Sequence, residues 1–125
     1  MTSVPPPVVA KTNRWAMIAL AASVLSMGNI LVAGLVAFDI PYSMVHDMRG
    51  AMYCQIGHCC VSSVFAALAL AGLVMGVTAV IQCRASKGAQ KGFGAGYTAV
   101  VISLAVFFLA HALWLTAAVV NLMRS

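Results

Sequence analysis

Residues 69–103, ALAGLVMGVTAVIQCRASKGAQKGFGAGYTAVVIS, decide the fold of this chain. Two apolar runs rich in small residues flank a short segment that carries all of the formal charge, namely Arg84, Lys87 and Lys91. Glycines at 88, 92, 94 and 96 favour a flexible turn, and the P-loop pattern that would cradle a phosphate is absent. The stretch therefore predicts two helices joined by a basic hairpin turn.

Apolar runs of this kind occur three times in the 125-residue chain, at residues 15–38, 61–83 and 92–123, and none contains a formally charged side chain. Each run is long enough to cross a hydrocarbon core, which takes about 20 predominantly apolar residues. With 63% hydrophobic and 7% charged residues, the chain is much more apolar than an average soluble domain. We predict an all-α integral membrane protein, with one domain over residues 15–125 and three transmembrane helices at about 15–38, 61–83 and 96–123.

The N-terminal segment, residues 1–14, lacks apolar periodicity. Pro5, Pro6 and Pro7 favour an extended polyproline conformation, so we expect a short disordered cytoplasmic tail. The apolar run that follows exceeds the roughly 7 to 15 residues of a secretory signal core, which favours an uncleaved anchor.

The basic residues predict the orientation. They precede the first run and separate the second from the third, whereas the first connection contains only Arg49. Because Lys and Arg in short loops mark the cytoplasmic side, we expect the N-terminus inside and the C-terminus outside, in a bacterial inner membrane. We expect Arg84, Lys87 and Lys91 to contact lipid headgroups, and the net charge of +5 needs no nucleic acid to explain it.

Small residues recur at four-residue spacing in the runs. Gly72 and Gly76, with Ala69 one turn before, form the clearest pattern, and the pairs Ala19/Ser23 and Ala99/Ser103 repeat it. Such positions let helix backbones approach closely in lipid. The pattern favours packing within the chain, with contact to another subunit as the alternative.

Two polar residues lie deep in the spans. Asn29 follows Trp15 by 14 residues, and His111 follows Tyr97 by 14, so both lie about 21 Å from their aromatic anchors. We expect this intramembrane polar pair to meet opposite Ala69 and Gly72. A neutral His111 bonded to Asn29 or to a backbone carbonyl is favoured over a proton relay or a cofactor ligand.

The connection MVHDMRGAMYCQIGHCC, residues 44–60, is rich in Met, His and Cys, the residue types that bind soft metals. On a helical wheel its methionines form one apolar stripe, which predicts an amphipathic segment lying on the outer membrane surface. The residues left for a possible copper or zinc site, or for a disulfide, are Asp47, Cys54, His58, Cys59 and Cys60. The expected bridge joins Cys54 to Cys59 or Cys60, because a vicinal bridge is strained.

The hairpin stretch resembles an uncharacterised bacterial family of short membrane proteins with a Pro-rich tail and a Gly-rich helical hairpin. The matching features are Pro5 to Pro7, Gly72, Gly76, the turn residues Arg84, Lys87 and Gly88, and the glycines from Gly92 to Gly96. The resemblance covers about half the chain and implies no activity.

Three functions remain open. The first is a structural or accessory subunit of a larger membrane complex, with other membrane subunits and lipid as partners and a homo-oligomer as a further option. The second is a metal-handling or redox membrane protein that uses the outer Cys, His and Met. The third is a small oligomeric channel or transporter. The only acids are Asp39 and Asp47, so we do not expect an enzyme or a required cofactor.

Overall fold

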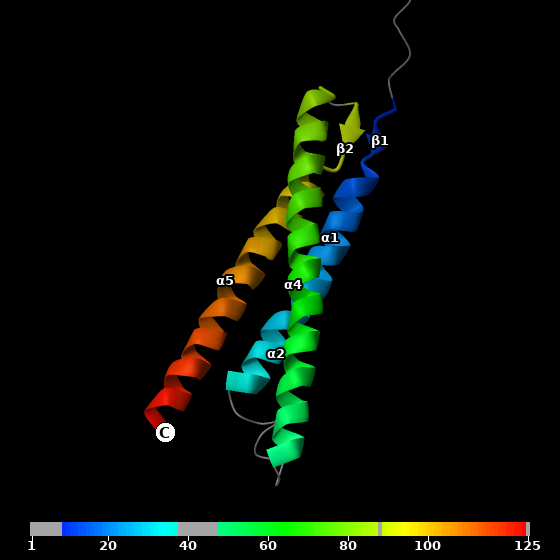
Figure 1. The fold of residues 1–125 in the computed structure, drawn as a ribbon. Helices are drawn as coiled ribbons and strands as arrows, with labels where there is room; N and C mark the ends of the chain where they lie inside the picture. The colour runs from blue at the N-terminus through cyan, green and yellow to red at the C-terminus, as the bar shows by residue number, and fades with distance from the viewer. Residues whose placement is uncertain (1–8, 38–47, 88, 125) are drawn as a thin grey trace, which may run out of the picture.

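The computed structural model describes residues 9–37, 48–87 and 89–124 of the chain. The elements, in chain order, are β1 (Lys11–Thr12), α1 (Arg14–Ser26), α2 (Gly28–Ala37), α4 (Met48–Ala85), β2 (Gln90–Lys91) and α5 (Phe93–Arg124) (Figure 1). Apolar, small-residue sequences without Pro favour helix throughout these long segments.

Three helical stretches are long and apolar enough to cross a membrane. They are Arg14–Leu35, which includes α1 and most of α2, Ile56–Ala85 in α4 and Phe93–Val120 in α5. The first and third run in the same direction and the second runs in the opposite direction (Figure 1). The prediction of an all-α chain with three potential membrane spans is confirmed, and the interfacial location of residues 44–60 stays a prediction.

The second helix begins well before its predicted start at residue 61. α4 runs without a break from Met48 to Ala85, so residues 48–60 are helical and continuous with the span. The amphipathic segment and the span form one helix because this stretch contains no Pro, and its two glycines only weaken a helix without ending it. α5 likewise begins at Phe93, ahead of the predicted residue 96.

Part of the predicted disordered tail is structured. β1 pairs with β2 in parallel, with Lys11 opposite Gln90. The Lys11 amide donates to the Ala89 carbonyl at 3.1 Å, and the Asn13 amide donates to the Lys91 carbonyl at 2.7 Å. The expectation of disorder is therefore wrong for residues 11–13, because the entry to α1 and the entry to α5 lie side by side. Residues 1–8 lie outside the described residues.

The first span is interrupted at Met27, between α1 and α2. The Ser26 hydroxyl donates to the Ser23 carbonyl at 2.6 Å, and such side-chain bonds near a glycine commonly bend a helix. At Gly28 an added Cβ would lie 2.5 Å from two atoms of the Phe65 ring. The break therefore coincides with the point where the first span packs against an aromatic side chain of α4.

The centre of the fold is a junction of three helices built from small residues. The Ser23 Oγ lies 2.9 Å from the Ser103 Oγ, 2.8 Å from the Ala19 carbonyl oxygen and 3.0 Å from the Ala99 carbonyl oxygen. These four residues are all buried. At Gly72 on α4, an added Cβ would overlap the Ser23 Oγ and lie 2.8 Å from the Ser103 Oγ. The small-residue pairs of the three helices therefore meet one another inside the chain.

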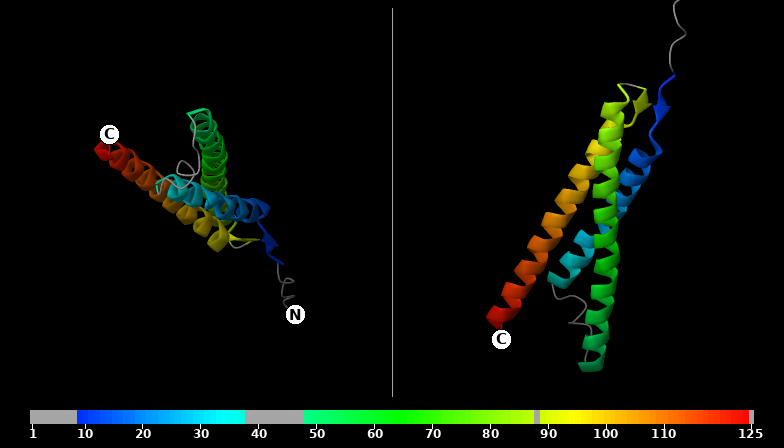
Figure 2. Two further views of the ribbon diagram at one scale, coloured as in Figure 1. Left: turned by 90° about the horizontal axis from the view of Figure 1, so that it is seen from below. Right: turned by 45° about the horizontal axis from the view of Figure 1, so that its top comes forward.

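The helices separate on the other side of this junction. α5 diverges from α4 toward the C-terminus, and α2 lies between them at that end (Figures 1 and 2). At the opposite end the two long helices stay close, since a Cβ at Gly76 would lie 3.0 Å from the Gly96 carbonyl oxygen. The two long helices thus lie close together near the α4–α5 turn and apart at the other end.

Candidate functional site

A cleft of about 400 Å³, mostly apolar but with several polar groups, lies where α2, α4 and α5 meet. Its polar lining residues are Asn29, Cys59, Ser62, Ser63, His111 and Trp114. Asn29 is 5% exposed, and its Oδ1 accepts a hydrogen bond of 2.8 Å from the Ser62 Oγ. The cleft therefore brings the two predicted intramembrane polar residues, Asn29 and His111, to one place.

His111 is held by its own helix. Its Nδ1 lies 2.7 Å from the Phe107 carbonyl oxygen, and its ring centroid is 4.2 Å from that of Phe107. Because a carbonyl oxygen only accepts, a neutral imidazole here carries its proton on Nδ1 and keeps its lone pair on Nε2. No hydrogen bond joins Asn29 to His111 in the part of the chain that the structure describes. Of the two expected partners of His111, the backbone carbonyl is the one found.

The residue of α4 that faces Asn29 is Ser62, and the expected level of Ala69 and Gly72 is wrong. Equal residue counts from the interface locate a common level only for straight, parallel helices, and the first span is interrupted at Met27. Gly72 lies against Ser23 in the three-helix junction, and Ala69 is buried.

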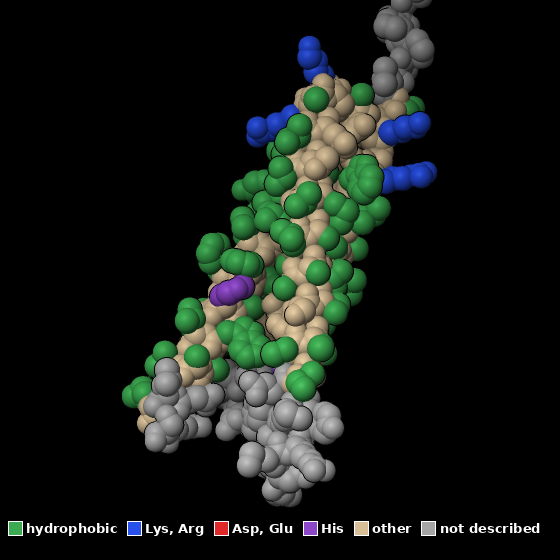
Figure 3. All heavy atoms as spheres, in the orientation of Figure 1, with side chains coloured by type: hydrophobic (Ala, Val, Ile, Leu, Met, Phe, Trp, Pro, Cys, Tyr) green, Lys and Arg blue, Asp and Glu red, His purple; other side chains and the backbone are tan. Residues whose placement is uncertain are grey.

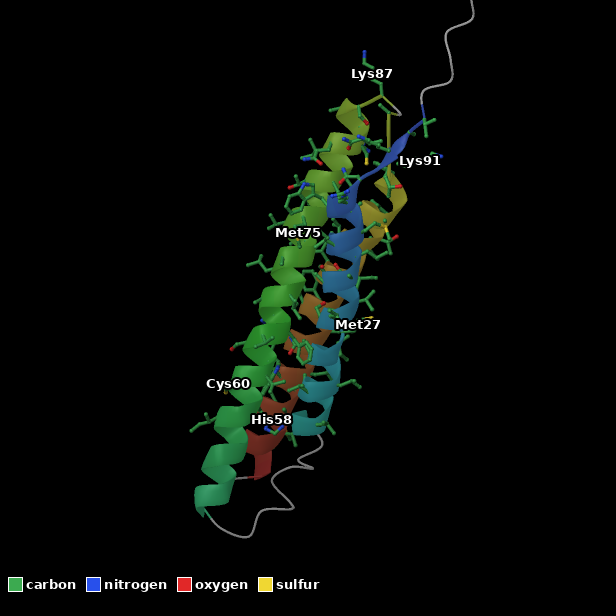
Figure 4. All side chains as sticks on the ribbon, turned by 90° about the vertical axis from the view of Figure 1, so that its right-hand side faces the viewer. Met27, His58, Cys60, Met75, Lys87 and Lys91 are labelled. Carbon is green, nitrogen blue, oxygen red and sulfur yellow. The ribbon has the colours of Figure 1, made fainter. Side chains whose placement is uncertain are left out.

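The outer part of α4 carries the thiols of the predicted metal or disulfide cluster. Cys59 and Cys60 are exposed with free thiols, and His58 is partly buried. Figure 4 shows His58 and Cys60 near the end of α4 that is remote from the basic turn. Of the predicted cluster, Cys59 is the thiol that also lines the cleft that contains His111.

The remaining members of that cluster are not placed by the structure. Asp47 lies outside the described residues, and for Cys54 only the helical backbone is described. Among the side chains of the described residues, no three His, Cys, Asp or Glu gather in a way that could hold a metal ion. Because two proposed ligands are not among them, the metal cluster stays a prediction.

The predicted disulfide from Cys54 to Cys59 or Cys60 is not formed, since the latter two thiols are free. Residues five and six positions apart on one continuous helix are separated by about 7.5 and 9 Å along its axis. A disulfide usually joins Cα atoms roughly 4.4 to 6.8 Å apart. The bridge needs a bend in this segment that α4 does not have.

The three residues predicted to contact lipid headgroups, Arg84, Lys87 and Lys91, are all exposed at one end of the molecule. In Figure 3, every Lys and Arg side chain drawn in colour lies at this end. The Arg84 guanidinium lies 5.5 Å from the centroid of the Phe93 ring, within the range of a cation–π interaction. Lys87 has a φ of +46°, the left-handed conformation that often follows a helix end. Figure 4 shows Lys87 and Lys91 together at this end.

Asn13 organises the same end, and the sequence analysis missed it. Its side chain is 5% exposed, and its Oδ1 accepts a 3.0 Å hydrogen bond from the Trp15 amide, capping α1. Its Nδ2 donates to the Gln82 Oε1 at 3.1 Å and to the Gln90 Oε1 at 3.0 Å. Gly92 packs against it with a φ of +125°, and a Cβ there would also lie 3.1 Å from Ala16.

One sequence signal could have identified this residue. An Asn directly before an apolar helical run is a typical N-cap, and Asn13 stands one position ahead of α1. Its partners in α4 and β2 are about 70 residues away in the chain, and local sequence patterns do not report such contacts.

The resemblance to an uncharacterised bacterial family stays a prediction. Comparison of the chain with protein-family models, with curated proteins and with solved structures found no match.

Proposed function

We propose that this protein is a small integral membrane protein that acts as a structural or accessory subunit of a larger membrane complex. The three potential spans include most of the described chain, so apolar helix surface is the main surface it offers to a partner. The chain has only two acidic residues, which supports a role that does not depend on acid–base catalysis.

The observation that carries the proposal is an apolar cleft of about 530 Å³ between α4 and α5. Three alanines and two leucines of α4 line one side, and small and bulky residues of α5 line the other: Ala66, Ala67, Ala69, Leu70, Leu73, Ser103, Leu104, Phe107 and Phe108. In lipid, helices associate through close packing, and small residues permit it. A cleft with small residues between bulky ones suits a ridge of side chains from another transmembrane helix better than mobile acyl chains, because packing attraction falls quickly with any gap.

The cleft can be tested by filling it. Ala67 is exposed and lines the cleft, whereas Ala21 is exposed on α1 and does not. We expect Ala67→Trp to abolish co-purification with larger subunits after gentle solubilisation from native membranes, and Ala21→Trp to retain it, as measured by native mass spectrometry. A wild-type protein that is isolated only as a monomer, or only as a homo-oligomer, contradicts the proposal.

One observation favours a second candidate, a metal-handling membrane protein. Cys59 and His111 line the same cleft, and the Nε2 of a neutral His111 retains its lone pair. Thiolate and imidazole together suit Cu(I) or Zn²⁺. We expect metal in protein purified from native membranes to be lost in both Cys59→Ser and His111→Asn and kept in Cys83→Ser. Equal metal content in all variants, or none in the wild type, excludes this candidate.

We also propose that the end with the basic turn faces the cytoplasm of a bacterium and that the membrane is the inner one. The clustering of exposed Lys and Arg side chains at that end supports this orientation.

A further inference from the structure

A second cavity, of about 900 Å³, lies at the basic end of the molecule. It is open to the surface and is formed by the N-terminal segment, the start of α1, the end of α4 and β2. Its polar and aromatic lining residues include Lys11, Thr12, Arg14, Trp15, Ser86 and Gln90. None of these residues is among those expected to contact lipid headgroups.

The cavity has positive charge without a compensating carboxylate. Lys11 and Arg14 both line it and are exposed, and no described residue is Asp or Glu. An Arg guanidinium matches the geometry of phosphate oxygens, and a neighbouring Lys adds charge and further donors. Two cations together with the hydroxyl of Thr12 therefore suit a phosphate group.

The polar wall of the cavity is preformed. Asn13, buried behind Lys11 and Arg14, ties the segment to α4 and β2 through Gln82 and Gln90. The backbone of Lys11 is fixed by its bond to the Ala89 carbonyl. A site held in place before binding loses less conformational entropy when the ligand arrives.

A smaller apolar groove continues from this cavity along the helices. It has a volume of about 290 Å³ and is lined by Trp15, Met75, Thr78 and Gln82, two of which, Trp15 and Gln82, also line the cationic cavity. Met75, Thr78 and Gln82 follow one another at three- and four-residue spacing, so they share one face of α4. The groove starts at the tryptophan nearest the basic end and runs toward the middle of the span.

We propose that the cavity and the groove together bind one anionic phospholipid. Lys11 and Arg14 hold its phosphate, and an acyl chain lies along Trp15, Met75 and Thr78. Trp15 is 51% exposed at the start of the first span, where aromatic side chains lie at the level of the headgroups. Basic pockets between helices on the cytoplasmic side bind acidic headgroups, and the groove favours a lipid over a soluble phosphate. Like the proposed function, this proposal requires that the protein is inserted in a membrane. Unlike the proposed function, it does not require a protein partner.

The charge can be tested on the isolated full-length protein by lipid retention in native mass spectrometry, with added phosphatidylglycerol or phosphatidylcholine. We expect Lys11→Gln/Arg14→Gln to weaken phosphatidylglycerol binding by about 30-fold, from about fivefold for each of the two cations lost near a membrane surface. Lys87→Gln/Lys91→Gln removes the same charge from the same end outside the cavity and so measures the general attraction of basic side chains for anionic headgroups; we expect it to weaken binding clearly less than the cavity pair. Equal weakening by both pairs, or equal retention of the two lipids by the wild type, overturns the site. Helicity measured by circular dichroism verifies the fold of each variant.

Substitutions in the groove can distinguish binding of a lipid from binding of a soluble phosphate. We expect Thr78→Trp to weaken binding of long-chain phosphatidylglycerol while leaving a short-chain analogue unchanged, and Val77→Trp, one position around the same helix, to change neither. The assignment to a lipid is overturned if inorganic phosphate competes with phosphatidylglycerol as effectively as the lipid itself. It is also overturned if Thr78→Trp leaves the binding of long-chain phosphatidylglycerol unchanged. Because no partner is present in these measurements, their outcome is independent of whether the accessory-subunit proposal holds.

Discussion

Position 72 has room for no side chain larger than hydrogen. An added Cβ there overlaps the hydroxyl of Ser23 and also comes within 3.1 Å of its backbone nitrogen, so a change of rotamer alone does not relieve the contact. The Ser23 hydroxyl lies within hydrogen-bond distance of the Ala19 and Ala99 carbonyl oxygens, and the Ser103 hydroxyl bonds to that of Ser23, which satisfies polar atoms that have no water available in a membrane. Gly72 thus allows three helix backbones and a polar pair to share one small volume.

Gly72→Ala should therefore separate the helices. We expect the free energy of unfolding in mixed micelles to fall by about 1 to 3 kcal/mol, the usual cost of overpacking a dense core. Gly34→Ala is the matched control, since a Cβ at Gly34 meets nothing within 4 Å and a helix gains up to about 1 kcal/mol from Ala in place of Gly. Equal stability of the two variants would show that the junction is looser than the contacts imply.

At the residue scale, sequence predicted the kind of contact but not its partners. Four-residue spacing identified Gly72, Ser23 and Ser103 as small packing positions, because this spacing follows from helix geometry alone. Which of these positions meet depends on the break at Met27 and on the helix tilts, both of which arise from contacts between helices. The same reason explains why Ser62 was missed as the partner of Asn29.

At the scale of elements, the short pairing of β1 with β2 connects the entry to α1 with the turn between α4 and α5. Two residue pairs give little stability alone, so the side chain of Asn13 is the main link between the two segments. The three helices could be predicted from the apolar runs, because a membrane-spanning helix needs about 20 predominantly apolar residues. The early start of α4 and the ordered segment before α1 were missed, since charged and polar residues there obscure the helical run or pair with distant backbone.

Asn13→Ala should release this connection without removing the helices. Loss of the cap and of two partly buried hydrogen bonds, to Gln82 and Gln90, is worth about 1 to 3 kcal/mol. We expect faster hydrogen–deuterium exchange at the amides of Asn13 and Trp15, with unchanged exchange in the middle of α5. Thr12→Ala, at the neighbouring exposed position, is the control and should leave the exchange as it is. If the amides of residues 13 and 15 exchange as slowly in Asn13→Ala as in the wild type, the pairing of β1 with β2, and not the Asn13 side chain, holds this segment in place.

At the scale of the whole molecule, the two ends of α4 differ in chemistry. One end has exposed basic side chains, and the other has the exposed thiols of Cys59 and Cys60. Cys60 and Lys87 are 27 residues apart, or about 40 Å along a helix, which exceeds the roughly 30 Å of a hydrocarbon core. Both can therefore reach the membrane surfaces, on opposite sides.

Thiol labelling can test this arrangement directly. In variants with a single cysteine, we expect native Cys60 to react with a membrane-impermeant maleimide in intact cells, and Lys87→Cys to react only after the membrane is permeabilised. A variant that retains only Cys83, which is 7% exposed, should react slowly in both conditions and controls for unfolding. The reverse pattern would place the basic end outside, against the usual retention of Lys and Arg in the cytoplasm, and would also remove the anionic inner leaflet from the proposed phospholipid site.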